Sequence, residues 1–253
     1  MHGGPPPECR CGKKQLDDGN RATGRVDRPG VKIGGVLVQI VLFDGFDPLD
    51  VIAPFEVLAA GRDAAGSGLA VELVSADGPR EVVSGTRGLT LRATVRLDPD
   101  RPGYVVVPGA SGPTAGDPDQ GVVTIPVLLA RFAESAAVPL LRAALRNPDV
   151  TVATVCGGSL ALAMAGLIEG RHAVTHKLGM DVLDATGVRA VPARVVDDGD
   201  LLSAGGVTSG LDLGLHILER EFGPRVAHAV ETLFEYERRG IVWRDTGRTP
   251  ITI

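Results

Sequence analysis

Short apolar runs that alternate with helical patterns are the feature that most constrains how this chain can fold. Four of the runs have strand length and lie at residues 36–43, 69–74, 104–107 and 151–156. Helical patterns lie at residues 48–60, 125–132, 139–146 and 158–167. Nearly continuous apolar strands between helices are typical of a parallel sheet that is buried on both faces. The sequence therefore predicts an α/β fold, a three-layer sandwich with a mostly parallel sheet and helices on both faces.

The rest of the chain adds shorter elements to this plan. Residues 82–95 alternate in polarity and contain two glycines, which predicts a hairpin. Short strands are expected at residues 172–175, 194–196 and 201–203. Further helices are expected at residues 177–185, from the glycine-rich segment 205–210 to about 222, and at 225–238. Because aromatic residues make up only 4% of the chain, its core must consist mainly of Ala, Val, Leu and Ile.

Composition divides the 253 residues into two zones. Residues 1–30 hold many prolines, glycines and charges, and such a segment cannot bury enough apolar surface to offset its ordering entropy. We expect a disordered tail over residues 1–30 and a single α/β domain over residues 31–253. The tail contains His2, Cys9 and Cys11, which fall short of the four ligands of a structural zinc site. We therefore expect no metal site.

Several classes of partner are excluded at this stage. The formal net charge is −5 and the chain has no basic stripe, so nucleic acid is not an expected partner. No apolar segment approaches the ~18 residues of a membrane span. The N-terminus lacks the apolar core of a signal peptide, and the three cysteines form no disulfide framework. These features predict a cytoplasmic protein without membrane contact.

Cys156 is the strongest candidate for a catalytic residue. It lies between an apolar strand and a helix, with Gly157 and Gly158 at the junction. Such a strand–turn–helix is the arrangement of a nucleophile elbow, which pushes the side chain out of the path of the backbone. Free N–H groups at the start of the helix favour a thiolate, so we expect a lowered thiol pKa. A buried cysteine can also be only a small apolar residue.

Other polar residues follow strands that end at the same edge of the predicted sheet. Asp50 is either a solvated carboxylate near a helix start or an acid–base partner of the thiol. His176 is either a loop residue or a second partner of Cys156. The segment 205–210 resembles a tight turn capped by Thr208 or Ser209 more than an anion site, and Asp212 fits the first turn of the helix that follows.

Taken together, the motifs resemble the ThiJ/PfpI superfamily, whose members share a class I glutamine-amidotransferase-like, flavodoxin-like fold. The resemblance is carried by residues 50–57, 107–110, 155–159, 175–176 and 205–212. It implies that Asp50 approaches Cys156 and that backbone N–H groups at Gly109, Ala110 and Gly157 form an oxyanion-type pocket. It also places Thr175, His176, Thr208 and Asp212 as possible pocket residues, and it implies a homodimer without a cofactor.

Within the superfamily, the chain is most similar to isonitrile hydratases and to the sensor domains of certain transcriptional regulators. Two residues depart from the hydratase pattern, Gly157 where Thr is common and Lys177 where Trp is common. The resemblance favours a hydratase that uses Cys156 and Asp50 to turn an isonitrile into an N-substituted formamide. One alternative is a glyoxalase or deglycase acting on small reactive aldehydes, a branch with Glu in place of Asp50. Another is a non-catalytic ligand or redox sensor that uses Cys156.

Overall fold

A computed structural model describes residues 1, 35–117, 120–249 and 251. The described residues from 35 onward belong to one compact unit. The segment expected to be a tail, residues 1–30, lies outside the described residues except for Met1, and so do Cys9 and Cys11.

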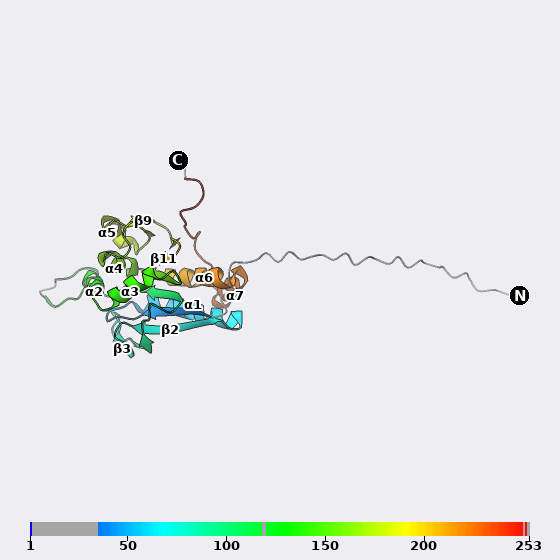
Figure 1. Ribbon diagram of the computed structural model, residues 1–253, viewed down its shortest axis with the longest axis horizontal. Coiled ribbons are helices and arrows are strands. Elements are labelled where there is room, and N and C mark those ends of the chain that lie inside the picture. Colours follow the sequence, from blue (N-terminus) through cyan, green and yellow to red (C-terminus); the bar gives the residue numbers. More distant parts are fainter. Residues whose placement is uncertain (2–34, 118–119, 250, 252–253) are drawn as a thin grey trace. The chain divides into compact units, whose positions relative to one another are not determined.

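A mostly parallel sheet forms the centre of the domain (Figure 1). Within the described residues it has seven strands, in the order β10 (Val195–Asp197), β11 (Leu201–Ala204), β7 (Val150–Val155), β6 (Gly103–Val107), β1 (Val36–Val41), β2 (Leu69–Ser75) and β5 (Val95–Arg96). The β10–β11 pair is antiparallel, and every other pair in this sheet is parallel. The predicted flavodoxin-like architecture is therefore confirmed.

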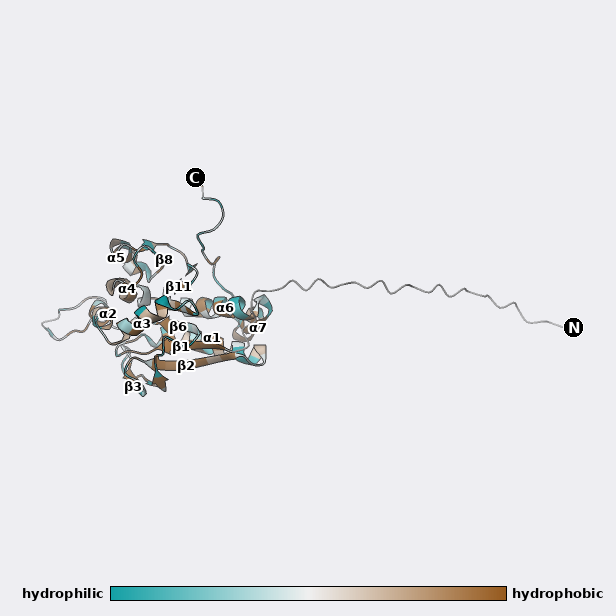
Figure 2. Cartoon of the chain, viewed as in Figure 1, coloured by the Kyte–Doolittle hydropathy of each residue, from teal (hydrophilic) through white to brown (hydrophobic). Residues whose placement is uncertain are grey.

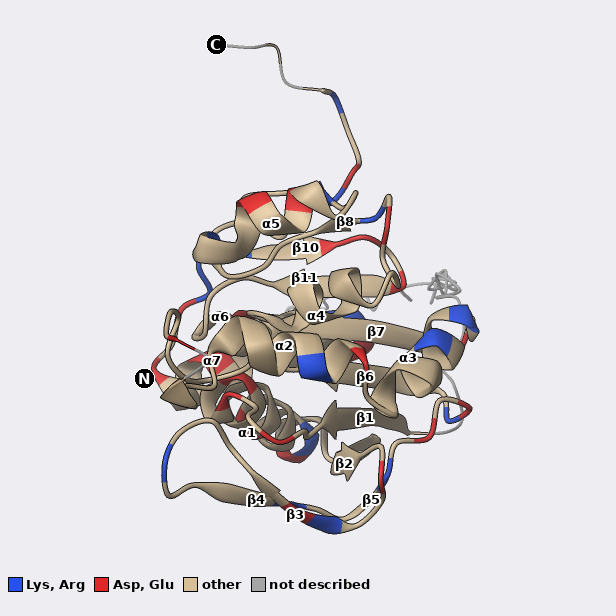
Figure 3. Ribbon diagram, turned by 90° about the vertical axis from the view of Figure 1, so that its left-hand side faces the viewer, with Lys and Arg blue, Asp and Glu red and all other residues tan. Residues whose placement is uncertain are grey.

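Two groups of helices cover the two faces of the sheet. One group consists of α1 (Pro48–Ala65), α6 (Ser209–Phe222) and α7 (Pro224–Phe234), which pack against one another. The other contains α2 (Ile125–Ala133), α3 (Ala137–Arg146), α4 (Gly158–Met164) and α5 (Met180–Ala185). Figure 3 shows α2 and α3 lying in front of the strands.

Five short elements lie beside this sandwich. The predicted hairpin is present as β3 (Arg80–Val83) and β4 (Thr90–Ala93), an antiparallel pair. The short strand β8 (His172–Ala173) pairs in parallel with β9 (Arg189–Ala190), which the sequence did not predict. A 3-10 turn, η2 (Lys177–Gly179), precedes α5.

The core lies where the apolar strands meet close-packed helices. Val38, Ile40 and Val41 of β1 are fully buried, and Figure 2 shows hydrophobic residues along β1, β2 and β6. Helices α1 and α6 approach closely because glycine stands at their contact. A side-chain carbon at Gly214 would lie 2.8 Å from Val57. This packing holds the first turn of α1, and with it Asp50, at the carboxyl end of the sheet.

Element ends differ from the sequence predictions where backbone geometry intervenes. Helix α1 continues through Pro54 to Ala65. Helix α4 ends at Met164 instead of residue 167, because Gly166 adopts a φ of 65°. Helix α7 ends at Phe234 instead of residue 238, and Glu235 follows with a φ of 48°. Across the described part of the chain, no helix combines the length and apolar character needed to cross a membrane.

The edge of the sheet is held by one buried carboxylate, Asp197 on β10. Its oxygens lie 2.9 Å from Nε2 of His216 and 2.9 Å from Nε of Arg244, and 3.4 Å from a guanidinium nitrogen of Arg220. Burial acts to raise the pKa of Asp197, but the hydrogen bonds from His216 and Arg244 outweigh it and lower the pKa. Asp197 thus joins α6 and the C-terminal segment to the edge strand.

We expect Asp197→Asn to lower the free energy of unfolding by about 2 kcal/mol at pH 7, because hydrogen bonds to a charged acceptor are lost. A lowered pKa contributes stability above the ordinary Asp pKa of about 4, and this contribution disappears as the pH falls below that value. Urea denaturation at pH 7 and pH 3 should show a smaller difference between variant and wild type at pH 3. Asp63→Asn, at an exposed ion pair with Arg62, is the control. An equal loss in both variants would contradict the prediction.

Candidate active site

Cys156 occupies a strained turn between β7 and α4. Its φ is 54°, in the left-handed region that non-glycine residues rarely adopt. The backbone N–H of Cys156 donates to the carbonyl of Ala204 at 2.9 Å, which ties the turn to β11. Strand, turn and helix follow one another as the sequence predicts, in the order of a nucleophile elbow.

The elbow is packed against the loop that follows β6, and glycine makes the approach possible. A side-chain carbon at Gly158 would lie 2.2 Å from the carbonyl oxygen of Val107. One at Gly109 would lie 2.5 Å from the backbone nitrogen of Gly157 and 2.9 Å from Oδ2 of Asp50. Any larger residue at these positions would push the elbow, the loop and the carboxylate apart.

Side-chain hydroxyl groups hold the elbow from the other side. Thr175, which follows β8, is buried and donates to the carbonyl oxygen of Cys156 at 2.7 Å. Ser159 donates to the carbonyl oxygen of Val174 at 2.7 Å and contacts the hydroxyl of Thr154. Neither Thr154 nor Ser159 was predicted as part of the site. Each is a polar residue in an otherwise apolar strand–turn–helix, which is the sequence feature that could have indicated a buried hydrogen bond.

Asp50 is brought to the elbow by the first turn of α1. Asp47 caps this helix by accepting the N–H of Leu49 at 2.9 Å, and Pro48 begins it. The Asp50 side chain is completely buried, and its Oδ2 accepts the N–H of Gly109 at 2.9 Å. Its Oδ1 is buried and has no regular hydrogen-bond partner among the described residues. The carboxyl therefore has an unused oxygen in the interior.

The Cys156 thiol lies beside the Asp50 carboxyl, and each group acts on the pKa of the other. Burial raises the pKa of Cys156, the negative charge of Asp50 raises it further, and the N–H of Gly157 opposes both effects. The expectation that the start of the helix lowers the thiol pKa is therefore wrong. The thiol is only 7% exposed, so the cost of removing a thiolate from water exceeds what a short helix returns.

The pKa of Asp50 is also raised well above the ordinary value for aspartate. Burial is the main cause and the charge of Asp47 adds to it, whereas the N–H of Gly109 and the contact with Cys156 act in the opposite direction. Each group therefore disfavours ionisation of the other, and the site favours states in which at least one of the two keeps its proton.

The three backbone N–H groups expected to form an oxyanion pocket differ in whether they are already hydrogen-bonded. The N–H of Gly109 is used by Asp50, so it positions the carboxyl and is not free for a ligand. The N–H of Gly157 hydrogen-bonds the Cys156 sulfur. The N–H of Ala110 donates to no acceptor within the described residues. Of the three, Ala110 retains an uncommitted donor.

Two of the other predicted pocket residues serve the structure. Thr208 accepts a hydrogen bond from Arg194 at 2.9 Å. Asp212 is buried and accepts hydrogen bonds from Arg194, from the Tyr236 hydroxyl and from the backbone N–H of Arg239. These contacts anchor the C-terminal segment to the start of α6. Asp212 thus belongs to an ion pair, and its carboxylate is fully occupied there.

His176 does not pair with the thiol. Its Nδ1 accepts the N–H of Leu178 at 3.3 Å and caps η2, and its ring lies over Gly206. No hydrogen bond joins it to Cys156 within the described part of the chain. Asp50, and not His176, is therefore the ionisable side chain that acts on the pKa of the sulfur. Among the described residues, no cluster of three or more His, Cys, Asp or Glu side chains is arranged to hold a metal ion.

Comparison with known proteins gives matches of three kinds. The model of the DJ-1/PfpI family matches residues 128–220. Isonitrile hydratase from Pseudomonas putida is 31% identical over 201 residues, which cover 79% of this chain and 78% of that protein. The crystal structure of a ThiJ/PfpI family protein from Pseudomonas syringae aligns with a TM-score of 0.65 at 21% identity, over 86% of this chain and 85% of that one. Drosophila melanogaster DJ-1beta aligns with a TM-score of 0.62 at 19% identity, over 81% of this chain and 100% of that one.

The raised pKa of Asp50 predicts how stability depends on pH. The folded protein binds the Asp50 proton more tightly than the unfolded chain does. Its contribution to stability is therefore complete below the ordinary Asp pKa of about 4 and is lost as the pH rises. Asp50→Asn keeps an acceptor for the Gly109 N–H without a buried charge. We expect this variant to be more stable than wild type at pH 8 by about 1–2 kcal/mol, with a smaller difference at pH 4, in urea denaturation. A variant less stable than wild type at pH 8 would contradict this.

We expect the Thr175 hydroxyl to keep the elbow closed. Thr175→Val removes one hydrogen bond of about 1 kcal/mol, which raises the population of the open elbow about fivefold. Iodoacetamide should then alkylate Cys156 about five times faster, measured by mass spectrometry on the Cys156 peptide because Cys9 and Cys11 also react. Thr175→Ser should restore the wild-type rate. Thr232→Val is the matched control, since Thr232 makes the same kind of bond on the exposed face of α7. Equal rates for Thr175→Val and wild type would remove this role.

Proposed function

This chain belongs to the DJ-1/PfpI family, and on that premise we propose that it is a cysteine-dependent hydratase that adds water to an isonitrile. The product is an N-substituted formamide. The observation that carries the proposal is the buried pair of Cys156 and Asp50 at a strained elbow. The similarity of this chain to isonitrile hydratase of Pseudomonas putida, over most of both chains, gives further support.

The first step uses the proton that the pair shares. With Asp50 ionised, its carboxylate takes the thiol proton as the Cys156 sulfur attacks the terminal carbon of the isonitrile. A carbon–sulfur bond forms, and Asp50 returns the proton to that same carbon. The result is a thioimidate on Cys156. A carboxyl group whose pKa is raised by burial suits this role, because it takes up and holds a proton more readily than an exposed carboxylate does.

The second step adds water to the thioimidate carbon. Asp50, ionised again after the first step, removes a proton from the water as its oxygen attacks. The carbon–sulfur bond then breaks, the sulfur recovers a proton, and the nitrogen gains the other. One water is consumed, no electrons are exchanged, and the enzyme returns to its starting state. Covalent catalysis of this kind divides one difficult addition into two easier ones. The free N–H of Ala110 is the donor we assign to charge that develops during attack.

The glycine after the nucleophile has a structural reason. A side-chain carbon at Gly157 would lie 3.1 Å from a methyl group of Leu129 on α2. A threonine at this position, which is common in the hydratases, would therefore require the Leu129 side chain to move by a few tenths of an ångström. We infer that Leu129 forms the wall that threonine supplies elsewhere, and that the substituent on the isonitrile nitrogen meets an apolar surface at this point.

The chemistry requires a reduced thiol, so we place the protein in the cytoplasm, where thiols stay reduced. We also propose that it forms a homodimer, on the basis of its resemblance to the superfamily. Neither proposal changes the assignment of Cys156 and Asp50.

The test is turnover of tert-butyl isonitrile, followed as formamide by NMR. We expect Cys156→Ala to lose activity completely and Asp50→Asn to lose about 10²–10⁴-fold, the usual contribution of a general acid–base group. Asp63→Asn, at an exposed position on the same helix, should retain wild-type activity. An equal rate for wild type and Cys156→Ala would end the proposal. So would conversion of methylglyoxal to lactate without any formamide, which would indicate an aldehyde-processing enzyme.

A further inference from the structure

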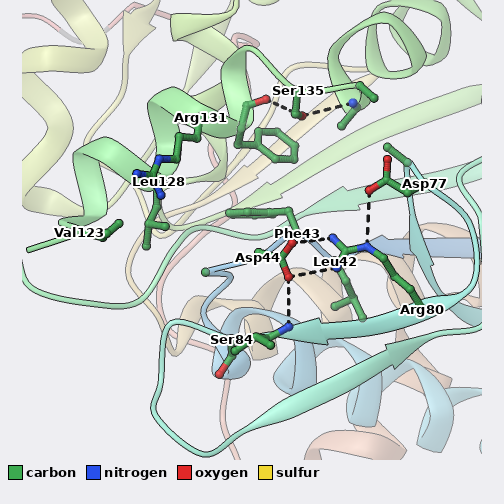
Figure 4. Close-up of a pocket in the computed structure, with 16 residues that line it drawn as sticks. Leu42, Phe43, Asp44, Asp77, Arg80, Ser84, Val123, Leu128, Arg131 and Ser135 are labelled. Carbon is green, nitrogen blue, oxygen red and sulfur yellow. Dashed lines mark hydrogen bonds and ion pairs between the residues drawn. The ribbon is translucent and has the colours of Figure 1, made fainter. Parts of the chain in front are cut away.

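A hollow lies at the carboxyl ends of β1 and β2, apart from the cysteine site. Its volume is about 500 Å³, and neither Cys156 nor Asp50 lines it. The strand ends, the start of the β3–β4 hairpin and the facing sides of α2 and α3 form its walls (Figure 4). In open α/β sheets, ligands bind at the carboxyl ends of the strands. The volume is within the range of small-molecule sites.

The walls are mainly apolar. The ring of Phe43 packs on that of Phe132 with centroids 4.5 Å apart. Leu42, Leu128 and Val123 add aliphatic surface. Val83 is 57% exposed at the rim, which is a large exposure for an apolar side chain on a strand. An apolar ligand body, and an aromatic one in particular, suits these walls.

The charges around the hollow are distributed unequally. Arg80 is held by two hydrogen bonds to Asp44, at 3.0 and 2.9 Å, and by Asp77 at 3.5 Å. Arg131 on α2 is exposed, and its side chain has neither an ion pair nor a hydrogen bond within the described residues. Figure 4 shows Arg131 beside Leu128 and Val123, on the opposite side of the hollow from the Asp44–Arg80 pair. One side therefore offers an unpaired cation, and the other carries two carboxylates that share one guanidinium.

We propose that this hollow binds a small aryl-alkyl monocarboxylate. Its carboxylate pairs with Arg131, and its uncharged ring lies against Phe43 and Leu128. A second anionic group at the far end would face Asp44 and Asp77, so dicarboxylates and phosphorylated aromatics are disfavoured. The guanidinium of Arg131 presents the planar donor pair that a carboxylate matches. The proposal does not depend on the hydratase activity, because none of the residues assigned to it lines the hollow: Cys156, Asp50, Gly109, Ala110 and Gly157.

The probe is 3-phenylpropanoate, titrated into the full-length protein and followed by calorimetry and by amide chemical shifts. We expect the largest shifts at residues 42–45 and 128–132. Arg131→Gln should weaken binding about tenfold, and Arg142→Gln, at an exposed arginine on α3 outside the hollow, should leave it unchanged. To wild type, the uncharged 3-phenylpropanamide should bind about tenfold more weakly than the acid. To Arg131→Gln, the amide and the acid should bind equally well.

Two further variants separate this site from the cysteine site. Val83→Glu places a negative charge on the exposed rim and should weaken the acid more than the amide. Cys156→Ser should bind the acid like wild type, whether or not isonitrile turnover is ever observed. Shifts centred on residues 156–158, equal affinities in the Arg131→Gln and Arg142→Gln variants, or no saturable binding at 20 mM acid would each overturn the proposal.

Discussion

A carboxyl group buried without full hydrogen bonding is the constraint on which the active-site architecture depends. Asp50 receives one backbone N–H, from Gly109, and its second oxygen faces the interior. An arrangement of this kind costs stability, and it persists because the packing around it is fixed. The close contact of α1 with α6, the glycines of the β6 loop and the left-handed turn at Cys156 all hold the acid and the thiol together. The proximity of the acid and the thiol thus depends on this packing.

Much of the fold could be predicted because its strands are buried on both faces. The runs at β1, β2, β6 and β7 were located from apolar content, and the alternation around Gly85 indicated the hairpin correctly. Helix ends were harder to place. Ile168 continues the apolar pattern of α4 but is buried from outside the helix, since the backbone turns at Gly166. Strand β9 is only two residues long and is defined by its pairing with β8, which no local pattern reveals.

The site was predictable in part. The glycines after Cys156 indicated the elbow, whereas the approach of Asp50 came from resemblance to a family and not from spacing. The thiol pKa was predicted with the wrong sign because a sequence does not report burial. Here the loss of hydration at 7% exposure outweighs the N–H of Gly157. The hydrogen bond from the Gly109 N–H to Asp50 could not be predicted either, because a backbone N–H is present at nearly every residue and has no sequence signature.

The raised pKa of the cysteine has a consequence for the life of the protein in the cell. Peroxide and disulfides react with thiolates far faster than with protonated sulfur. A buried thiol that keeps its proton therefore reacts slowly with such oxidants when no substrate is bound. In the proposed mechanism its nucleophilicity is released only when Asp50 takes that proton, so a reactant that reaches the pair and bonds to sulfur in the same event has an advantage over diffusing oxidants. Burial of the protonated thiol thereby lowers the rate at which the Cys156 sulfur is oxidised.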